Sequence, residues 1–198
     1  AIILSSLGRP AEALPKVEAA LEMRQRLFPG DHPDVAASLN EVAHTLQMFL
    51  NRPAEALPKG EAALEMYQRL HEGDHPDVAL ALNNVAVSLG SLGRSDEALP
   101  KYEAALEMRQ RLFPGDQPDV AWSLGQLACV LEKPGRAQEA LPKFEAELEM
   151  NQRLHAGDHP EVAKSLNWVG GCLRDLGRPA DALPKFEAAL EMNQRLHK

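Results

Sequence analysis

One segment of the sequence matches a pattern that could bind zinc. His71, Glu72 and His75 fit HExxH, in which two histidines one helical turn apart hold the metal and the glutamate is a general base. That chemistry requires a helix, whereas Gly73 lies inside the run and Pro76 follows it. We therefore expect a turn here, with no metal site, no cofactor and no peptidase activity.

The remaining reactive residue types form no catalytic set. Cys129 and Cys172 lie in different segments, and neither has a histidine nearby in the sequence to activate its thiol. Two cysteines cannot build a disulfide framework, which favours a reducing compartment, and we expect a cytoplasmic protein. Gly170 and Gly171 belong to a helical pattern and form no phosphate-binding loop. We predict no catalytic residues, so the chain is not expected to be an enzyme.

The charge balance restricts the partners. The 198 residues include 21 Lys and Arg against 29 Asp and Glu, a net charge of −8. This balance argues against a nucleic-acid backbone or an anionic membrane as the main partner. Apolar runs fall far short of the roughly 20 residues that span a bilayer. We therefore expect neither nucleic acid nor membrane to be bound.

The segments that must position any functional residue repeat along the chain. Glu12–Lys16 recurs at 55–59, 97–101, 139–143 and 181–185, with spacings of 43, 42, 42 and 42 residues. The one extra residue falls between Val35 and Arg52, where we expect it to be confined to a turn. The chain therefore reads as a single array with these boundaries: a partial leading repeat 1–31, then repeats 32–74, 75–116, 117–158 and 159–198.

Each period contains two helical patterns. The longer runs from about Ser95 to Phe113 and the shorter from about Pro76 to Leu92, each with apolar residues on one face. We expect Pro76 in the first turn of the shorter helix, Asp74 as its N-cap and Gly93 as its stop. Because one helix pair cannot bury its own apolar faces, neighbouring pairs must stack. The predicted fold is all-α, a right-handed α-solenoid of antiparallel helix pairs.

These residues resemble a known family. The run Asn83-Asn84-Val85-Ala86, followed by Leu89, Gly93, Glu97-Ala98, Tyr102 and Ala105-Leu106, is similar to the tetratricopeptide repeat (TPR). The 42-residue step and the Gly-Asp-His-Pro-Asp-Val turn resemble its kinesin-light-chain-like subtype. The resemblance covers the whole chain and implies a non-catalytic scaffold that binds a protein or peptide in a concave groove. Two residues depart from the pattern: Gly60 at an aromatic position and Glu147 at a small one.

The resemblance places the short helices along the groove, so their outward residues are the candidate ligand contacts. They are Asn40, His44, Leu80, Asn83, Asn84, Val87, Trp122, Gln126, Lys164, Asn167, Trp168 and Arg174. Amides at the equivalent positions 40, 83 and 167 can hydrogen-bond a peptide backbone, or are simply solvated. Trp122 is the strongest candidate for an apolar anchor, with packing between helices as the alternative for both tryptophans. The ionisable groups of this face are mixed, which predicts no strong preference for acidic or basic ligands.

Three further interpretations stay open. The sequence begins without Met, so the array could be the sensor or regulatory arm of a larger signalling ATPase or protease. The last helix presents Leu183, Phe186, Leu190 and Leu196 with no helix following, which predicts end-to-end self-association. The periodic arginines Arg9, Arg52, Arg94, Arg136 and Arg178 form an anion-binding row or, the interpretation we favour, balance helix ends.

Overall fold

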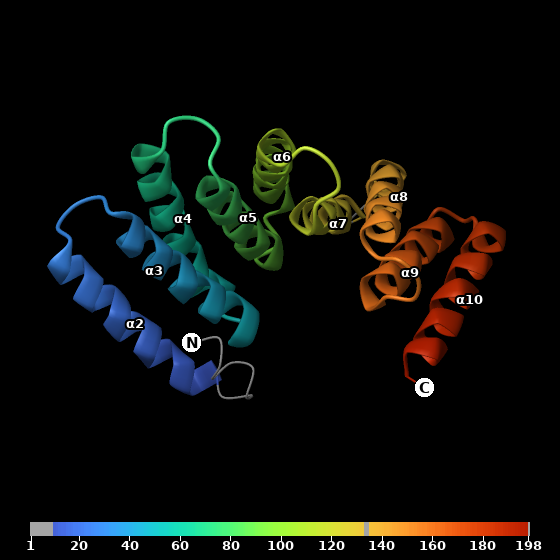
Figure 1. Ribbon diagram of the computed structural model, residues 1–198, viewed down its shortest axis with the longest axis horizontal. Helices are drawn as coiled ribbons and strands as arrows, with labels where there is room; N and C mark the ends of the chain where they lie inside the picture. Colours follow the sequence, from blue (N-terminus) through green and yellow to red (C-terminus); the bar gives the residue numbers. More distant parts are fainter. Residues whose placement is uncertain (1–9, 133–134, 198) are drawn as a thin grey trace. The chain divides into compact units, whose positions relative to one another are not determined.

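The computed structural model describes residues 10–132 and 135–197, and this part of the chain folds into helices joined by short turns (Figure 1). The helices are α2 (Pro10–Leu27), α3 (Pro33–His44), η1 (Thr45–Phe49), α4 (Pro53–Leu70), α5 (Pro76–Ser91), α6 (Ser95–Leu112), α7 (Pro118–Glu132), α8 (Ala137–Leu154), α9 (Pro160–Asp175) and α10 (Pro179–Leu196). None of these helices combines the length and the hydropathy needed to cross a bilayer. The expected long and short helices over Ser95–Phe113 and Pro76–Leu92 are confirmed to within one residue.

The chain divides into two compact units, the first ending at Met108 and the second beginning at Arg109, near the end of α6. In the first unit α3 packs between α2 and α4, and α4 also packs on α5. In the second unit α7 packs on α8, α8 on α9, and α9 on α10. These successive helices therefore pack on one another, as the stacking argument requires, and the predicted all-α solenoid class is confirmed.

Histidines, rather than the expected aspartate, cap the short helices. The Nδ1 atoms of His32, His75 and His159 accept a hydrogen bond from the backbone N–H two residues later, at 3.2 Å in each case. Pro76 occupies the first turn of α5 as expected, where a missing N–H costs nothing. The prediction of Asp74 as the cap is wrong, because the helix starts one residue later than that assignment assumed.

The inserted residue of the first repeat lies inside a helix and not in a turn. Thr45–Phe49 forms a π-helical turn that continues α3, and this wider turn takes up the one extra residue. Asn51 then takes a left-handed conformation, with φ of 50°, where the later repeats use Gly93, Gly135 and Gly177. Those glycines end their helices as predicted.

The core follows the predicted apolar stripe. Val78, Leu82 and Val85 on α5 are at most 7% exposed. Gly60, which stands at an aromatic position of the pattern on α4, is buried, and a Val85 methyl group lies 3.2 Å from where a Cβ on Gly60 would stand. The space left by the missing aromatic ring is therefore occupied at this point by the neighbouring helix.

Candidate functional site

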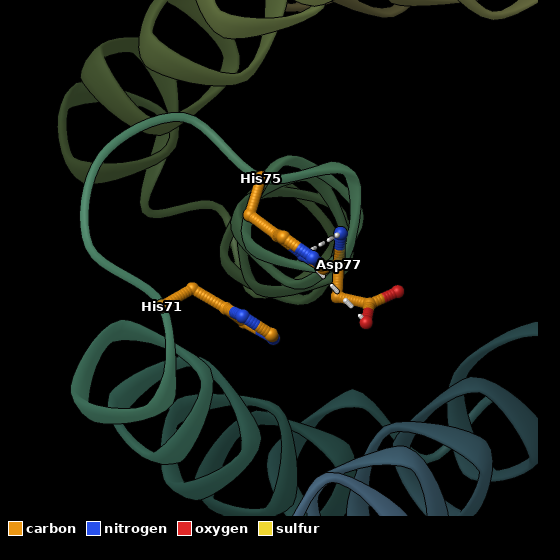
Figure 2. Close-up of side chains that lie close together, drawn as sticks. All are labelled: His71, His75 and Asp77. Carbon is orange, nitrogen blue, oxygen red and sulfur yellow. Dashed lines mark hydrogen bonds and ion pairs between the residues drawn. The ribbon is translucent and has the colours of Figure 1, made fainter.

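The HExxH segment forms the turn between α4 and α5, so the expected absence of a helix there is confirmed. Figure 2 shows the rings of His71 and His75 lying one over the other, with Asp77 beyond His75. The ring centroids are 3.4 Å apart and the planes differ by 4°. Ligand atoms of His71, His75 and Asp77 all lie within 4.8 Å of one another, the only such grouping in the described ranges.

The stacking of these rings explains the cluster without a metal. Parallel stacked rings direct their nitrogen lone pairs in parallel planes instead of toward one point, and His75 Nδ1 already accepts the Asp77 N–H. The same stack occurs between Phe28 and His32, at 3.8 Å, where no second imidazole is present. The ring at this position packs against the histidine cap in each of these turns. The arrangement supports a structural role for His71.

In the first unit, the asparagines that the sequence suggested for ligand binding are buried or hydrogen-bonded to one another. Asn84 Nδ2 donates to Asn40 Oδ1 at 2.8 Å, which joins α5 to α3. Asn40 is 8% exposed and Asn83 is fully buried, so the expectation that both face outward is wrong. The equivalent residue of the second unit, Gly125, also faces the next helix. A Cβ on Gly125 would lie 2.8 Å from the Glu147 side chain of α8. Asn167 is exposed.

Three candidates of the first unit border a small hollow. His44 is exposed and its ring meets Phe49 edge-on at 5.5 Å, while Leu80 is 42% exposed. His44, Asn84 and Val87 border a hollow of about 10 Å³, which holds at most one water molecule. No peptide side chain fits there without a rearrangement.

The second unit has two larger cavities. The first, of about 450 Å³, lies along α9 and extends to α10 and the end of α7. Its lining includes four predicted contacts, Lys164, Asn167, Trp168 and Arg174. The Trp168 ring is 38% exposed and stacks on Phe144 of α8, with centroids 5.9 Å apart and planes within 4°. This buried partner holds the ring in place while leaving part of it open to a ligand.

The second cavity, of about 400 Å³, lies among α7, α8 and α9. Its lining residues are Pro118, Asp119, Trp122, Glu147, Asn151, His155, Glu161 and Lys164. Trp122 is 37% exposed and lies 5.7 Å from the Arg109 guanidinium carbon, a cation–π contact. Lys164 borders both cavities and pairs with Glu161 at 3.2 Å. Gln126, also a predicted contact, is half-buried and is not among the lining residues of either cavity.

Glu147 is the residue that sequence reasoning flagged without explaining. Only 4% of it is exposed, and its carboxylate occupies the space that Gly125 leaves free. Burial raises the pKa of the Glu147 carboxyl to about 7, while the positive charge of Lys164 acts in the opposite direction. A shift of α8 is not needed, because α7 carries a glycine where the other short helices carry asparagine. Comparing positions 125 and 147 across the repeats could have found this pair.

A second set of buried polar pairs was missed. Arg109 is 5% exposed and donates to Ser123 Oγ and, at 3.4 Å, to the Asp119 carbonyl. Burial lowers the pKa of Arg109, although the guanidinium remains charged. Asn151 and Ser165 occupy the equivalent positions and are 2.9 Å apart. The sequence could have indicated these pairs, since a serine stands fourteen residues after Arg109 and after Asn151.

The periodic arginines are neutralised within their own repeats. Arg52, Arg94 and Arg136 each bridge the glutamate three residues later, with nitrogen–oxygen distances of 2.6 to 2.8 Å. Arg178 bridges Asp181 at 2.7 Å. These pairs lower the pKa values of Glu55, Glu97 and Glu139 through the arginine hydrogen bonds. Because these arginines pair with carboxylates at helix starts, they support the interpretation that the arginines balance helix ends over that of an anion-binding row. Arg9 lies outside the described residues.

Comparisons with known proteins agree on the fold. The tetratricopeptide repeat sequence model matches residues 1–69, 50–111, 77–153 and 119–195. No curated protein sequence matches the chain.

Three solved structures illustrate the similarity. A protein from Podosopora anserina, assigned as a kinesin light chain with nearly identical TPR-like repeats, has 18% identity and a TM-score of 0.83, covering 98% of this chain and 92% of that one. BtubC (BKLC) from P. vanneervenii has 22% identity and a TM-score of 0.84, covering 98% and 79%. A Rap protein complexed with competence and sporulation factor has 14% identity and a TM-score of 0.78, covering 96% and 51%. The resemblance to the kinesin-light-chain-like fold is thereby confirmed.

Proposed function

Since the chain belongs to the tetratricopeptide repeat family, we propose that it is a protein-interaction scaffold whose second unit binds a peptide segment of a partner. The observation that carries this proposal is the pair of cavities, of about 450 and 400 Å³, that share Lys164. Each is lined by a tryptophan that is more than one-third exposed. Half-exposed aromatic side chains beside a hollow are the usual anchors of an interface.

Interaction scaffolding also fits the state of the buried thiol. Cys172 donates to the Ala137 carbonyl at 3.3 Å, and burial raises the pKa of its thiol to about 11. A thiol with that pKa is a poor nucleophile at neutral pH. The Rap complex supports only the class of function, because the identity is 14%.

Intrinsic fluorescence tests the proposal directly, because the only two tryptophans of the chain are Trp122 and Trp168. Peptides would be selected by display on the immobilised full chain, and their affinities measured by the change in tryptophan emission. Trp122→Phe and Trp168→Phe variants assign that change to one cavity or the other.

Replacing an anchor should weaken binding far more than replacing a residue of the first unit. We expect Trp122→Ala or Trp168→Ala, measured by calorimetry, to weaken binding about tenfold or more. Leu80→Ala is the matched control, since Leu80 is 42% exposed on the equivalent face of the first unit. Equal losses in all three variants would contradict the assignment to the second unit.

Self-association is a second candidate function. Leu183 and Leu190 on α10 are 58% and 59% exposed, as the sequence suggested for the last helix. Two large apolar side chains about two turns apart form a face that a second copy could cover. Sedimentation equilibrium should show an oligomer that Leu183→Lys with Leu190→Lys dissociates, whereas a monomer at all concentrations excludes this function.

A further inference from the structure

Gly171 stands in the interior of α9 without a packing reason. A glycine inside a helix lowers the stability of that helix relative to alanine. The preceding residue, Gly170, has such a reason, because a Cβ there would lie 2.9 Å from the Phe186 ring of α10. A Cβ on Gly171 would meet no side chain, and no backbone of another helix, within 4 Å among the described residues. The packing of the helices therefore leaves the space beside Gly171 open.

The other short helices carry a side chain at this position. The equivalent residues are His44 on α3, Val87 on α5 and Cys129 on α7. The fold therefore accommodates a side chain here, and the glycine of α9 removes it. The open space belongs to the cavity of about 450 Å³ in the second unit, which Gly171 lines.

Two aromatic rings stand beside this open space. Trp168, about one turn before Gly171 on α9, and Phe186 of α10 line the same cavity. Trp168 is 38% exposed, and the planes of its ring and the Phe144 ring lie within 4° of one another. The stacking on Phe144 holds the tryptophan in place before a ligand arrives. A further ring in the cavity would gain the attraction of offset or edge-to-face aromatic pairs.

The neighbouring glycine shows which kind of group fits against this helix. An edge of the Phe186 ring occupies the place of a Cβ on Gly170, with three ring carbons 2.9 to 3.1 Å from that position. A flat ring can enter a space this narrow, whereas a branched aliphatic side chain is thicker in every direction. Gly171 offers the same bare backbone one residue later, on the side that faces the cavity.

The charges around the cavity favour an uncharged ligand group. The carboxylates of Glu132 and Asp175 line it, together with the cations of Lys164 and Arg174. Arg174 bridges Asp175 at 2.9 Å, and Lys164 bridges Glu161 at 3.2 Å. Acidic and basic lining residues are therefore equal in number, and both cations already have a carboxylate partner.

We propose that this cavity binds an aromatic side chain, phenylalanine or tyrosine, of the partner segment, with the ring over Gly171 and against Trp168. The inference rests on the proposed function for the existence of a partner and adds the class of side chain that the partner must present. It keeps the sequence-based expectation of no preference for acidic or basic ligands.

The experiment is an NMR titration of the full ¹⁵N-labelled chain with N-acetyl-phenylalanine amide and N-acetyl-tyrosine amide. We expect saturable shifts of the Trp168 indole N–H and the Gly171 amide. The Trp122 indole N–H is the internal reference and should not shift, because Trp122 lines the other cavity. N-acetyl-cyclohexylalanine amide, which has the carbon skeleton of phenylalanine without a flat ring, should bind at least threefold more weakly.

Replacing the glycine should close the site. Gly171→Val recreates the residue that α5 carries as Val87, and it should lose most of the Trp168 shift. Cys129→Val is the matched control, since it places the same side chain at the equivalent position of α7, which lines neither of the two cavities. This control should retain the shift.

A second variant guards against misfolding of Gly171→Val. Gly171→Ala adds only a methyl group to an open space and replaces glycine with the best helix former. It should unfold at the same temperature as the wild type or higher, and still bind the phenylalanine probe at least threefold more weakly. Equal binding of the cyclohexylalanine probe, or undiminished binding by both Gly171 variants, would overturn the inference.

The outcomes also separate this inference from other occupants and from the proposed function. A Trp168 indole shift that depends on protein concentration without any probe would assign the cavity to a second copy and overturn the inference. If no probe shifts Trp168 but selected peptides still change the tryptophan fluorescence, the aromatic site is wrong and the scaffold proposal stands. If the probes bind at Gly171 but no peptide binds through Trp122 or Trp168, the scaffold proposal fails and the aromatic site remains.

Discussion

The two units share their turns and the pattern of their core but present different short-helix faces. In the first unit, side chains pair with one another: Asn84 with Asn40 at 2.8 Å and Gln47 with Ser91 at 2.9 Å. In the second unit, Trp168 stands at the position of Asn84, and cavities of about 450 and 400 Å³ open beside the helices. A few substitutions on an unchanged scaffold therefore decide which face has room for a ligand.

The contrast extends to the helix interface beneath that face. Asn83 and Ala105 of one repeat are replaced by Gly125 and Glu147 in the next. The larger side chain of the pair therefore lies on the long helix instead of the short helix. Both arrangements bury a polar group that lacks a hydrogen bond to the described residues: the amide of Asn83 and the Oε2 atom of Glu147. Only the second group can ionise, and this difference yields the largest predicted effect.

Glu147 should make the second unit less stable as the pH rises. The folded pKa of about 7 exceeds the ordinary glutamate pKa of 4.5, so the folded state binds more protons between these values. Stability is therefore fully present below about pH 4.5, decreases as the pH rises toward 7 and is constant above it. The full loss is about 3 kcal/mol.

The measurement is urea unfolding of the wild type and Glu147→Gln between pH 4.5 and 8.5. Subtracting the two curves removes the titration of all other groups. The difference should grow in favour of the variant up to about pH 7 and then level off. A flat difference would show that Glu147 is ionised and satisfied in the folded state, which would remove this contrast between the units.

Arg109 provides the next largest effect. In the first unit, α4 and α5 have Tyr67 and Ala81 at the positions of Arg109 and Ser123, whereas α2 and α3 keep a polar pair, Arg24 and Ser38. Arg109→Ala removes two hydrogen bonds and a buried stem, and we expect it to lower the free energy of unfolding by about 2 kcal/mol.

The matched control transfers the pair that α4 and α5 use at these positions. Arg109→Tyr with Ser123→Ala should recover stability to within about 1 kcal/mol of the wild type, measured by urea unfolding. If the double variant is no more stable than Arg109→Ala, the two positions do not act as interchangeable pairs.

The sequence predicted what depends on local pattern and failed where packing decides. Helix bounds, the apolar stripe and the glycine stops follow from periodicity and backbone conformation. The burial of Asn83 could not be read from a helical wheel, because it depends on which neighbouring helix covers that side. The cavities likewise depend on pairs such as Gly125 and Glu147, twenty-two residues apart, whose sizes matter only jointly.

Asn83 supplies a smaller test of the first unit. It is fully buried and neither amide atom has a hydrogen-bond partner among the described residues. Asn83→Leu keeps the branching and approximate volume while removing both unpaired groups, so we expect a gain of about 1 kcal/mol in urea unfolding. A loss instead would mean that the amide has a partner, such as a buried water, that this packing requires.

The smallest predicted effect concerns a turn that is alike in both units. His71 stacks on His75 and His155 on His159, at 3.4 and 3.5 Å, and Phe28 takes the same place beside His32. His71→Phe should therefore change the free energy of unfolding by no more than about 0.5 kcal/mol. Adding Zn²⁺ should shift the Tm of wild type and variant equally, because ring stacking, and not metal binding, is what the turns have in common. A Zn²⁺-dependent rise in Tm confined to the wild type would instead make His71, His75 and Asp77 a metal site, and would make this turn, with its HExxH pattern, unlike the others.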